Sequence, residues 1–205
     1  MSAVLLERET KTSESVVEAR PGMLVEAALA EDEALYEVEY GRRVEKLMSA
    51  VDSAFASELG SRLFLFLQAQ RSGRVIVEGM FILDTERDLR RRPDVASISA
   101  QRWPLDKPLP AQGDWPVVPD LAVEVVSPYE TVERLTQKVD EYFRYGARQV
   151  WVVMPRLRRV YVYSSATAVR ILTEQEELEG GEVVPGFRLK LSELFAAVPV
   201  ETSAS

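Results

Sequence analysis

The sequence predicts an α/β (α+β) domain with a mixed central β-sheet flanked by α-helices, and three observations support this prediction. Short runs of alternating or wholly apolar residues, typical of strands, recur along the chain. Segments 50–71 and 130–145 instead show apolar residues at helical spacing, and Gly146 ends the second helix. This helix joins strands 121–126 and 149–153 through short connections, which predicts a βαβ unit with parallel strands.

The chain divides into one domain and two ends. Residues 1–30 are rich in Glu, Thr and Ser, so we expect a flexible or partly helical N-terminal segment. A short helix is expected over 23–35. Residues 31–198 are expected to form a single domain, and 199–205 a tail.

The first elements of the domain follow from local patterns. Alternation over 35–47 predicts a hairpin that turns near Gly41. One apolar stripe predicts the helix 50–71, which Gly73 is expected to end. Residues 74–83 predict a single strand with a glycine inside, where a bulge would form. The helical stripe consists of Val51, Phe55, Leu59, Leu63, Phe66 and Leu67.

The remaining elements complete the sheet. Residues 93–99 predict a strand, and the five prolines within 101–119 predict an irregular loop. Segments 158–164 and 168–172 predict a hairpin near the end of the chain. Residues 192–195 predict a short closing helix.

Composition excludes several kinds of chemistry. The 205 residues include no cysteine and no histidine, so disulfides, thiolate zinc sites and Ser-His-Asp or Cys-His catalysis are excluded. Any chemistry must use carboxylates, lysine, arginine, tyrosine or hydroxyls, and these oxygen ligands suit Mg²⁺ or Mn²⁺. The net charge of −8 argues against a protein that coats nucleic acid non-specifically.

No membrane segment is expected. The most apolar run, 63–67, is far shorter than the ~20 residues that span a bilayer. The first residues have no signal-peptide pattern. We therefore expect a cytoplasmic protein with no membrane partner.

Two acids in the strand PDLAVEVVSP raise the possibility of a metal site. Asp120 and Glu124 point to the same face, because side chains alternate along a strand. At ~3.3 Å per residue their Cα atoms lie roughly 13 Å apart, too far to share one Mg²⁺. Asp120 is therefore expected at the strand entry or in an outer shell of the site. Glu124 needs a partner from elsewhere.

Asp94 is the best candidate for that partner. If strands 94–99 and 121–126 pair antiparallel, Asp94 lies opposite Glu124 or its neighbour, with Cβ atoms ~4.5–5.5 Å apart. That separation suits a shared ion. The alternative for Asp94 is a solvated acid in a Pro-Asp turn.

Lys138 adds a third group. It lies beside the apolar stripe of its helix, and about 12 Å of helix returns it to the level of Glu124. An ammonium there can position an attacking water or stabilise developing phosphate charge. The alternative is a lysine whose stem covers the edge of the core.

Further candidates surround these three residues. Glu37, Glu45 and Glu78 are candidates for additional ligands, although the alternative, a surface carboxylate, is favoured for each. An arginine cluster precedes Asp94, where a phosphate would approach, so it is a candidate for nucleic-acid contact. That cluster includes Arg90, Arg91 and Arg92.

Taken together, these segments resemble the Uma-type "putative restriction endonuclease" family of the PD-(D/E)XK nuclease superfamily. The resemblance covers roughly 33–196 and implies a restriction-endonuclease-like fold with a divalent ion at its acidic site. It is carried by RRRPDVASIS (90–99), PDLAVEVVSP (119–128), TQKVDEYFRYGARQVWVVMP (136–155), VVPGFRLKLSELF (183–195) and the opening LYEVEYGRRVEKL (35–47).

The resemblance also implies roles for particular residues. Asp94 matches the aspartate of the PD motif and Glu124 the acid of (D/E)XK, so both would bind Mg²⁺ or Mn²⁺. Val126 stands where that motif has lysine, and Lys138 matches members that carry the lysine on the following helix. The chain also departs from the family pattern at Tyr40 and Met154, each in place of an aspartate.

The implied function is Mg²⁺-dependent hydrolysis of DNA phosphodiester bonds by a homodimer, with RNA as another possible substrate. The alternative is a non-catalytic interaction or regulatory module that retains the nuclease fold. The acidic composition and the missing E-x-K lysine favour the module. A third possibility is a metal-dependent hydrolase of small phosphorylated molecules.

Overall fold

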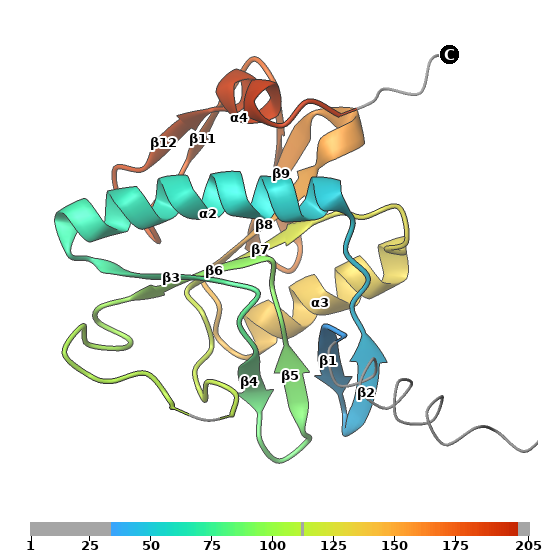
Figure 1. Cartoon of the computed structure of the whole chain (residues 1–205), viewed down its shortest axis with the longest axis vertical. Coiled ribbons are helices and arrows are strands. Elements are labelled where there is room, and N and C mark those ends of the chain that lie inside the picture. Colours follow the sequence, from blue (N-terminus) through green and yellow to red (C-terminus); the bar gives the residue numbers. More distant parts are fainter. Residues whose placement is uncertain (1–33, 112, 201–205) are drawn as a thin grey trace, which may run out of the picture. The chain divides into compact units, whose positions relative to one another are not determined.

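The structure is a computed structural model and describes residues 34–111 and 113–200. The expected N-terminal segment over 1–30, all but the last two residues of the expected helix over 23–35, and most of the expected tail lie outside these ranges. A six-stranded sheet forms the centre, in the order β10-β9-β8-β7-β6-β3 (Figure 1). Its strands are β3 (Gly73–Val77), β6 (Val95–Ser99), β7 (Leu121–Val125), β8 (Gln149–Met154), β9 (Arg159–Ser165) and β10 (Ala168–Thr173).

Two smaller sheets accompany the central sheet. A four-stranded antiparallel sheet has the order β2-β1-β5-β4, and a two-stranded sheet pairs β11 with β12. The strands of these sheets are β1 (Tyr36–Glu39), β2 (Arg42–Glu45), β4 (Phe81–Asp84), β5 (Leu89–Arg91), β11 (Glu177–Glu179) and β12 (Arg188–Lys190).

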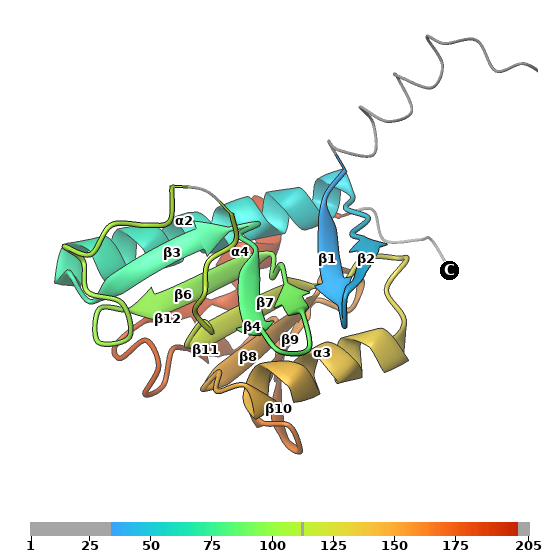
Figure 2. The ribbon, with the colours of Figure 1, turned by 90° about the horizontal axis from the view of Figure 1, so that it is seen from below.

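Helices cover both faces of the central sheet. Figure 2 shows α2 (Ala50–Gln70) and α3 (Val132–Arg144) on opposite sides of the strands, and the structure also contains α4 (Leu191–Ala197). A single-turn 3₁₀ helix, Pro155–Leu157, follows β8. The predicted fold of a mixed sheet flanked by helices is confirmed. None of the helices described is long and apolar enough to cross a membrane.

The expected βαβ unit is confirmed. β7 and β8 pair in parallel and α3 connects them, whereas the other neighbouring strands of the central sheet run antiparallel. Thr131 caps the N-terminus of α3 through its side-chain oxygen. The predicted first hairpin, the loop over 101–119, the hairpin of β9 and β10, and the closing helix are also present.

The prediction of one strand over 74–83 is wrong. The chain leaves the central sheet after β3 and enters the four-stranded sheet at β4. Glu78 sits at this break in the left-handed region, with φ of 54°. Gly79 follows it, and a Cβ at that position would lie 2.4 Å from the Ile76 side chain. The position at which the sequence predicted a bulge is therefore the point where the chain passes from the central sheet to the four-stranded sheet.

Two other local predictions need correction. Helix α2 ends at Gln70, and the left-handed Arg71 caps it, whereas Gly73 already belongs to β3. The charged segment before Asp94 contains the strand β5, which its sequence did not reveal. Such a short, charged strand is set by pairing with β1 and β4, not by its own propensity.

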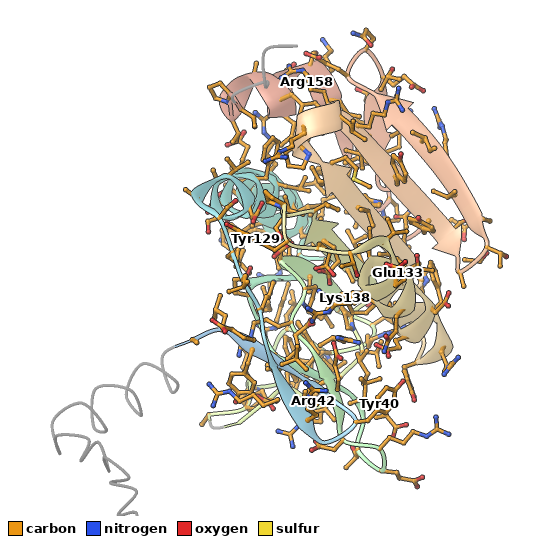
Figure 3. The ribbon with its side chains drawn as sticks, turned by 90° about the vertical axis from the view of Figure 1, so that its right-hand side faces the viewer. Tyr40, Arg42, Tyr129, Glu133, Lys138 and Arg158 are labelled. Carbon is orange, nitrogen blue, oxygen red and sulfur yellow. The ribbon has the colours of Figure 1, made fainter. Side chains whose placement is uncertain are left out.

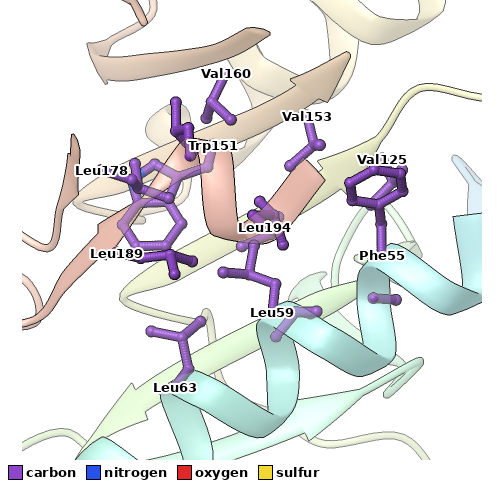
Figure 4. Close-up of a cluster of buried hydrophobic side chains, with 14 of the residues drawn as sticks. Phe55, Leu59, Leu63, Val125, Trp151, Val153, Val160, Leu178, Leu189 and Leu194 are labelled. Carbon is purple, nitrogen blue, oxygen red and sulfur yellow. The ribbon is translucent and has the colours of Figure 1, made fainter. Parts of the chain in front are cut away.

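The core has two parts because side chains alternate along each strand. Leu121, Val123 and Val125 of β7 face α2, and Figure 4 shows Phe55, Leu59 and Leu63 packed on this side. Ala122 belongs to the other cluster, beneath α3. Glu124 follows the same alternation, so the fold directs its carboxylate toward α3.

Leu63→Ala should lower the free energy of unfolding by roughly 2–5 kcal/mol, since Leu63 is fully buried and its truncation leaves a cavity. Leu65→Ala on the same helix is the matched control. Leu65 is 64% exposed, so its loss should change stability by less than about 0.5 kcal/mol. Denaturant unfolding measures both, and equal effects would contradict the packing described here.

Candidate active site

The structure places Asp94 and Glu124 beside each other on neighbouring strands. In the antiparallel pairing of β6 with β7, Val95 lies opposite Val123. One residue further out, Asp94 therefore lies opposite Glu124, and both residues line the same hollow. The Asp94 and Glu124 side chains are 3% and 5% exposed, so both carboxylates need partners inside the protein.

Asp94 has two such partners. The backbone amide of Val125 donates to its Oδ2, and Lys46 Nζ donates to its Oδ1 at 2.6 Å. Lys46 follows β2 directly and also donates to Glu78 Oε2 at 3.0 Å and to the Arg92 carbonyl at 2.8 Å. Burial alone would lower the pKa of Lys46, but the surrounding carboxylates raise it, so the side chain stays charged.

Glu124 is held by two residues of α3. Lys138 Nζ lies 3.2 Å from Glu124 Oε2, and the Tyr142 hydroxyl donates to Oε1 at 2.7 Å. Lys138 and Tyr142 are four residues apart, so they share one face of the helix. Burial raises the pKa of Glu124, and the negative charge of Asp94 adds to this against the opposing effect of Lys138.

Lys138, labelled in Figure 3, contacts two further carboxylates. Its Nζ lies 3.4 Å from Glu37 Oε2 and 3.6 Å from Glu130 Oε2. Burial would lower its pKa, but Glu124 and Glu37 outweigh this and raise it. Lys138 is thus a fixed positive charge between three acids from different segments.

Arg91 forms the centre of a buried ionic network. Its Nη1 lies 2.9 Å from Glu37 and 2.8 Å from Glu39, and its Nη2 lies 2.6 Å from Glu141. The guanidinium joins β1 to α3, and its side chain is 1% exposed. This placement corrects the expectation that Arg91 contacts nucleic acid: it positions other site residues.

The two neighbouring arginines also have partners within the protein. Arg90 pairs with Asp88 and Asp114, each at 2.7 Å, and its side chain is 36% exposed. Arg92 donates to the backbone carbonyls of Tyr36 and Glu78. Arg90 therefore keeps some access to solvent, whereas Arg92 supports the backbone around the site.

Asp120 lies at the far end of β7 from Glu124. Its Oδ2 accepts from the Ser99 amide at 2.8 Å, and its Oδ1 pairs with Arg102 at 3.1 Å. This carboxylate joins β6 to the loop before β7. Asp120 directly precedes β7, so of the two expectations for this residue its contacts fit the strand entry rather than an outer shell around Glu124.

The other candidate acids differ in their placement. Glu37 is buried and contacts Lys138, Glu78 contacts Lys46, and Glu45 is exposed but lines the same hollow. Burial raises the pKa of Glu78 to about 7, with the negative charge of Asp94 acting in the same direction. Glu37 and Glu78 thus belong to the cluster, and Glu45 stands at its edge.

These groups surround a hollow of about 60 Å³, which has room for a few water molecules. Asp94, Glu124 and Lys138 line it, together with Lys46, Glu130 and Arg134. The lining residues come from the first hairpin and the segment after it, from α2, β7 and α3, from the loop between β7 and α3, and from the residue just before β6. A polar, partly enclosed hollow of this kind can hold a hydrated ion or one phosphate group.

The donor set fits a hard divalent cation. Carboxylate oxygens of Asp94 and Glu124 are ligands that Mg²⁺ accepts, and Mg²⁺ commonly binds one or two carboxylates and several waters. Within residues 34–111 and 113–200, no three acidic side chains form a group ready to hold a metal ion. Two carboxylates, with water completing the coordination, suffice for such an ion.

Comparisons with known proteins agree with this geometry. The family model described as "Uma2: Putative restriction endonuclease" matches residues 26–192. The chain belongs to the Uma2 family. No curated protein matched the chain. This membership supports a nuclease-like function for the Uma2 chain.

A solved structure supports the fold. The chain resembles the crystal structure of a "putative nuclease belonging to DUF820" from Anabaena variabilis ATCC 29413, with a TM-score of 0.68 and 20% sequence identity. The alignment covers 80% of this chain and 90% of the other. At this identity, the likeness establishes the fold of this Uma2 protein.

The sequence did not reveal several residues of the Uma2 site. Lys46 follows a short exposed strand and belongs to no periodic pattern, so nothing local marks it. Tyr142 could have been found, because its spacing of four from Lys138 puts both on one helix face. Arg91 and Glu141 depend on the pairing of β5 with β1, which only the tertiary fold defines.

Arg91→Met should destabilise the protein by about 3–5 kcal/mol, because it leaves the buried Glu37 and Glu141 without the positive charge of Arg91. Arg90→Met is the control, and the loss of its more exposed ion pairs should change stability by less than about 1 kcal/mol. Chemical unfolding at pH 7 measures both. Similar small losses would show that the buried network does not hold the two elements together.

Glu37 should contribute to the pH dependence of stability. Burial would raise its pKa, but Lys138 and Arg91 lower it from 4.5 to about 2. The stabilisation, roughly 3 kcal/mol, is present above pH 4.5 and is lost as the pH falls toward 2. Glu37→Gln should therefore be less stable than wild type at pH 6, and the difference should shrink at pH 2.5. A constant difference in unfolding free energy would contradict this assignment.

Proposed function

We propose that the protein is a nuclease that hydrolyses DNA phosphodiester bonds and depends on Mg²⁺ or Mn²⁺. One observation carries the proposal: Asp94, Glu124 and Lys138 come from separate segments to line one polar hollow. Membership of the family described as "Putative restriction endonuclease" supports the same chemistry.

The residues have distinct roles in this proposal. Asp94 and Glu124 hold the ion, and the Val125 amide and the Tyr142 hydroxyl fix the orientation of their carboxylates. Lys138 lies beside Glu124 and borders the hollow, so its ammonium orients the attacking water and stabilises negative charge on the phosphate. A bound Mg²⁺ would supply Lewis-acid polarisation of the phosphate and a water of lowered pKa.

Supporting residues keep this arrangement rigid. Arg91 holds Glu37, and Glu37 in turn contacts Lys138. Arg134 lines the hollow with a side chain that is 37% exposed, so it is a candidate for contact with a phosphate of the nucleic acid. Glu78 lies beside Asp94 and is a candidate for an additional ligand.

The proposal includes substrate and assembly. DNA is the proposed substrate, with RNA to be tested beside it, and the protein is proposed to act in the cytoplasm. Concerted cleavage of both strands of a duplex needs two such hollows, and a homodimer would provide them. Analytical ultracentrifugation with and without duplex DNA tests this assembly.

Glu124→Gln and Asp94→Asn should each reduce cleavage of plasmid DNA by at least about 100-fold, since each removes a negative ligand of the ion. Glu133→Gln is the matched control, because Glu133 lies on the exposed side of α3 (Figure 3) and should retain full activity. The assay follows nicking and linearisation in Mg²⁺ and in Mn²⁺. Equal rates for wild type and Glu124→Gln would exclude catalysis by this site.

The alternative function, a non-catalytic module, is favoured by one observation. Lys46 and Lys138 already neutralise Asp94 and Glu124 in the structure. A module would neither cleave nucleic acid nor bind Mn²⁺. Calorimetric titration with Mn²⁺, run beside the cleavage assay on DNA and RNA, separates the two functions.

A further inference from the structure

The ammonium group of Lys46 has the surroundings of a metal ion. Within 3.3 Å of Nζ lie one oxygen of Asp94, both oxygens of Glu78 and the carbonyl oxygen of Arg92. Two carboxylates and one backbone carbonyl are the kind of oxygen ligands that a hard divalent cation takes. Yet the occupant is a side chain of the protein itself.

This position overlaps the one required by the proposed function. Lys46 Nζ donates to Oδ1 of Asp94, whereas the Val125 amide donates to the other oxygen, Oδ2. Oδ2 is already engaged by that amide, so Oδ1 is the oxygen left for an ion. Lys46 also acts electrostatically on Glu124, the second proposed ligand. An ion and the Lys46 ammonium cannot both occupy this place.

The distances explain why the acids are not arranged as a ready metal site. An ammonium holds its oxygens at 2.6–3.3 Å, whereas Mg²⁺ holds them at about 2.0–2.1 Å. Ligands that surround Lys46 therefore stand farther apart than an ion requires. Replacing the ammonium by an ion would draw them together.

The Lys46 side chain can also move away from Asp94 without a change in the backbone. Its backbone amide is fixed to the Leu35 carbonyl at 2.8 Å, but its flexible stem carries the charge, and the side chain borders the hollow. Rotation of the stem would move the ammonium from Asp94 without moving the hairpin. The charge would then lie at the hollow, where a phosphate would bind.

We propose that Lys46 is a built-in competitor for the metal ion: it occupies the cation position of the site, and a divalent ion binds Asp94 only when Lys46 is displaced. This inference rests on the proposed metal site and adds its regulation. While Lys46 occupies this position, its ammonium balances the negative charge of Asp94, and the site binds a divalent ion more weakly than it would without Lys46. Displacement would give it a second lysine besides Lys138 near the substrate.

Lys46→Met tests the competition, because methionine keeps much of the length of the stem and removes the charge. Calorimetry should show at least about tenfold tighter Mn²⁺ binding than wild type, and Asp94→Asn in the Lys46→Met background should abolish it. Arg134→Met controls for a general effect of charge, because Arg134 lines the hollow without contacting Asp94. Its Mn²⁺ affinity should change less than about threefold.

A second measurement uses the wild-type chain and needs no variant to fold. Lys46 is 9% exposed at its side chain, so acylation by an amine reagent should be slow without metal. Saturating Mg²⁺ should raise its labelling at least about fivefold, as measured by mass spectrometry. Lys138, 2% exposed, should stay protected, and the exposed Lys190 should react equally in both conditions.

The outcomes are distinct. Mn²⁺ binding by Lys46→Met that is no tighter than wild type, or Lys46 labelling unchanged at saturating Mg²⁺, overturns the competition. Tighter binding together with increased labelling supports it, even if no nucleic acid is cleaved. If both changes are seen but no nucleic acid is cleaved, the proposed nuclease function fails, whereas the proposed competition between Lys46 and the ion is supported.

Discussion

Charge buried between the four-stranded sheet and α3 is the constraint on which the rest of this structure depends. Arg91 lies where water does not reach, and it joins acids of β1 to an acid of α3. Because an unpaired buried charge is strongly destabilising, these elements can pack together only in a register that pairs every member. The same register brings Glu37 to Lys138 and Lys138 to Glu124. Scaffold and candidate site are therefore one electrostatic unit.

The central sheet was accessible from sequence because its signals are local. The βαβ unit around α3 shows strand and helix periods with capping residues, and the structure has it as predicted. The placement of Asp94 beside Glu124 followed from strand geometry once the two strands were paired. By contrast, β5 and the break between β3 and β4 arise from pairing between distant segments. No local pattern encodes such pairing.

The limits of sequence reasoning at the site have the same physical origin. Lys138 could be placed because a helix has a fixed rise and a fixed face. Lys46 could not, since its partners Asp94 and Glu78 come from the residue just before β6 and from the turn after β3, and neither is near it in sequence. The run of arginines before Asp94 also led to a wrong prediction. Such charge runs are usually exposed, yet Arg91 is among the most buried side chains.

The turn at Glu78 has a consequence for how this protein can change. A residue with a side chain is disfavoured at its positive φ of 54°, and glycine or asparagine would relax the backbone there. Either replacement would remove the carboxylate that holds Lys46. At position 78, the residue that would stabilise the backbone is therefore not the residue that keeps the cluster intact. Strained residues at functional sites commonly show this trade-off. Selection for thermal robustness alone would favour losing the glutamate, whereas selection for the intact cluster would retain it.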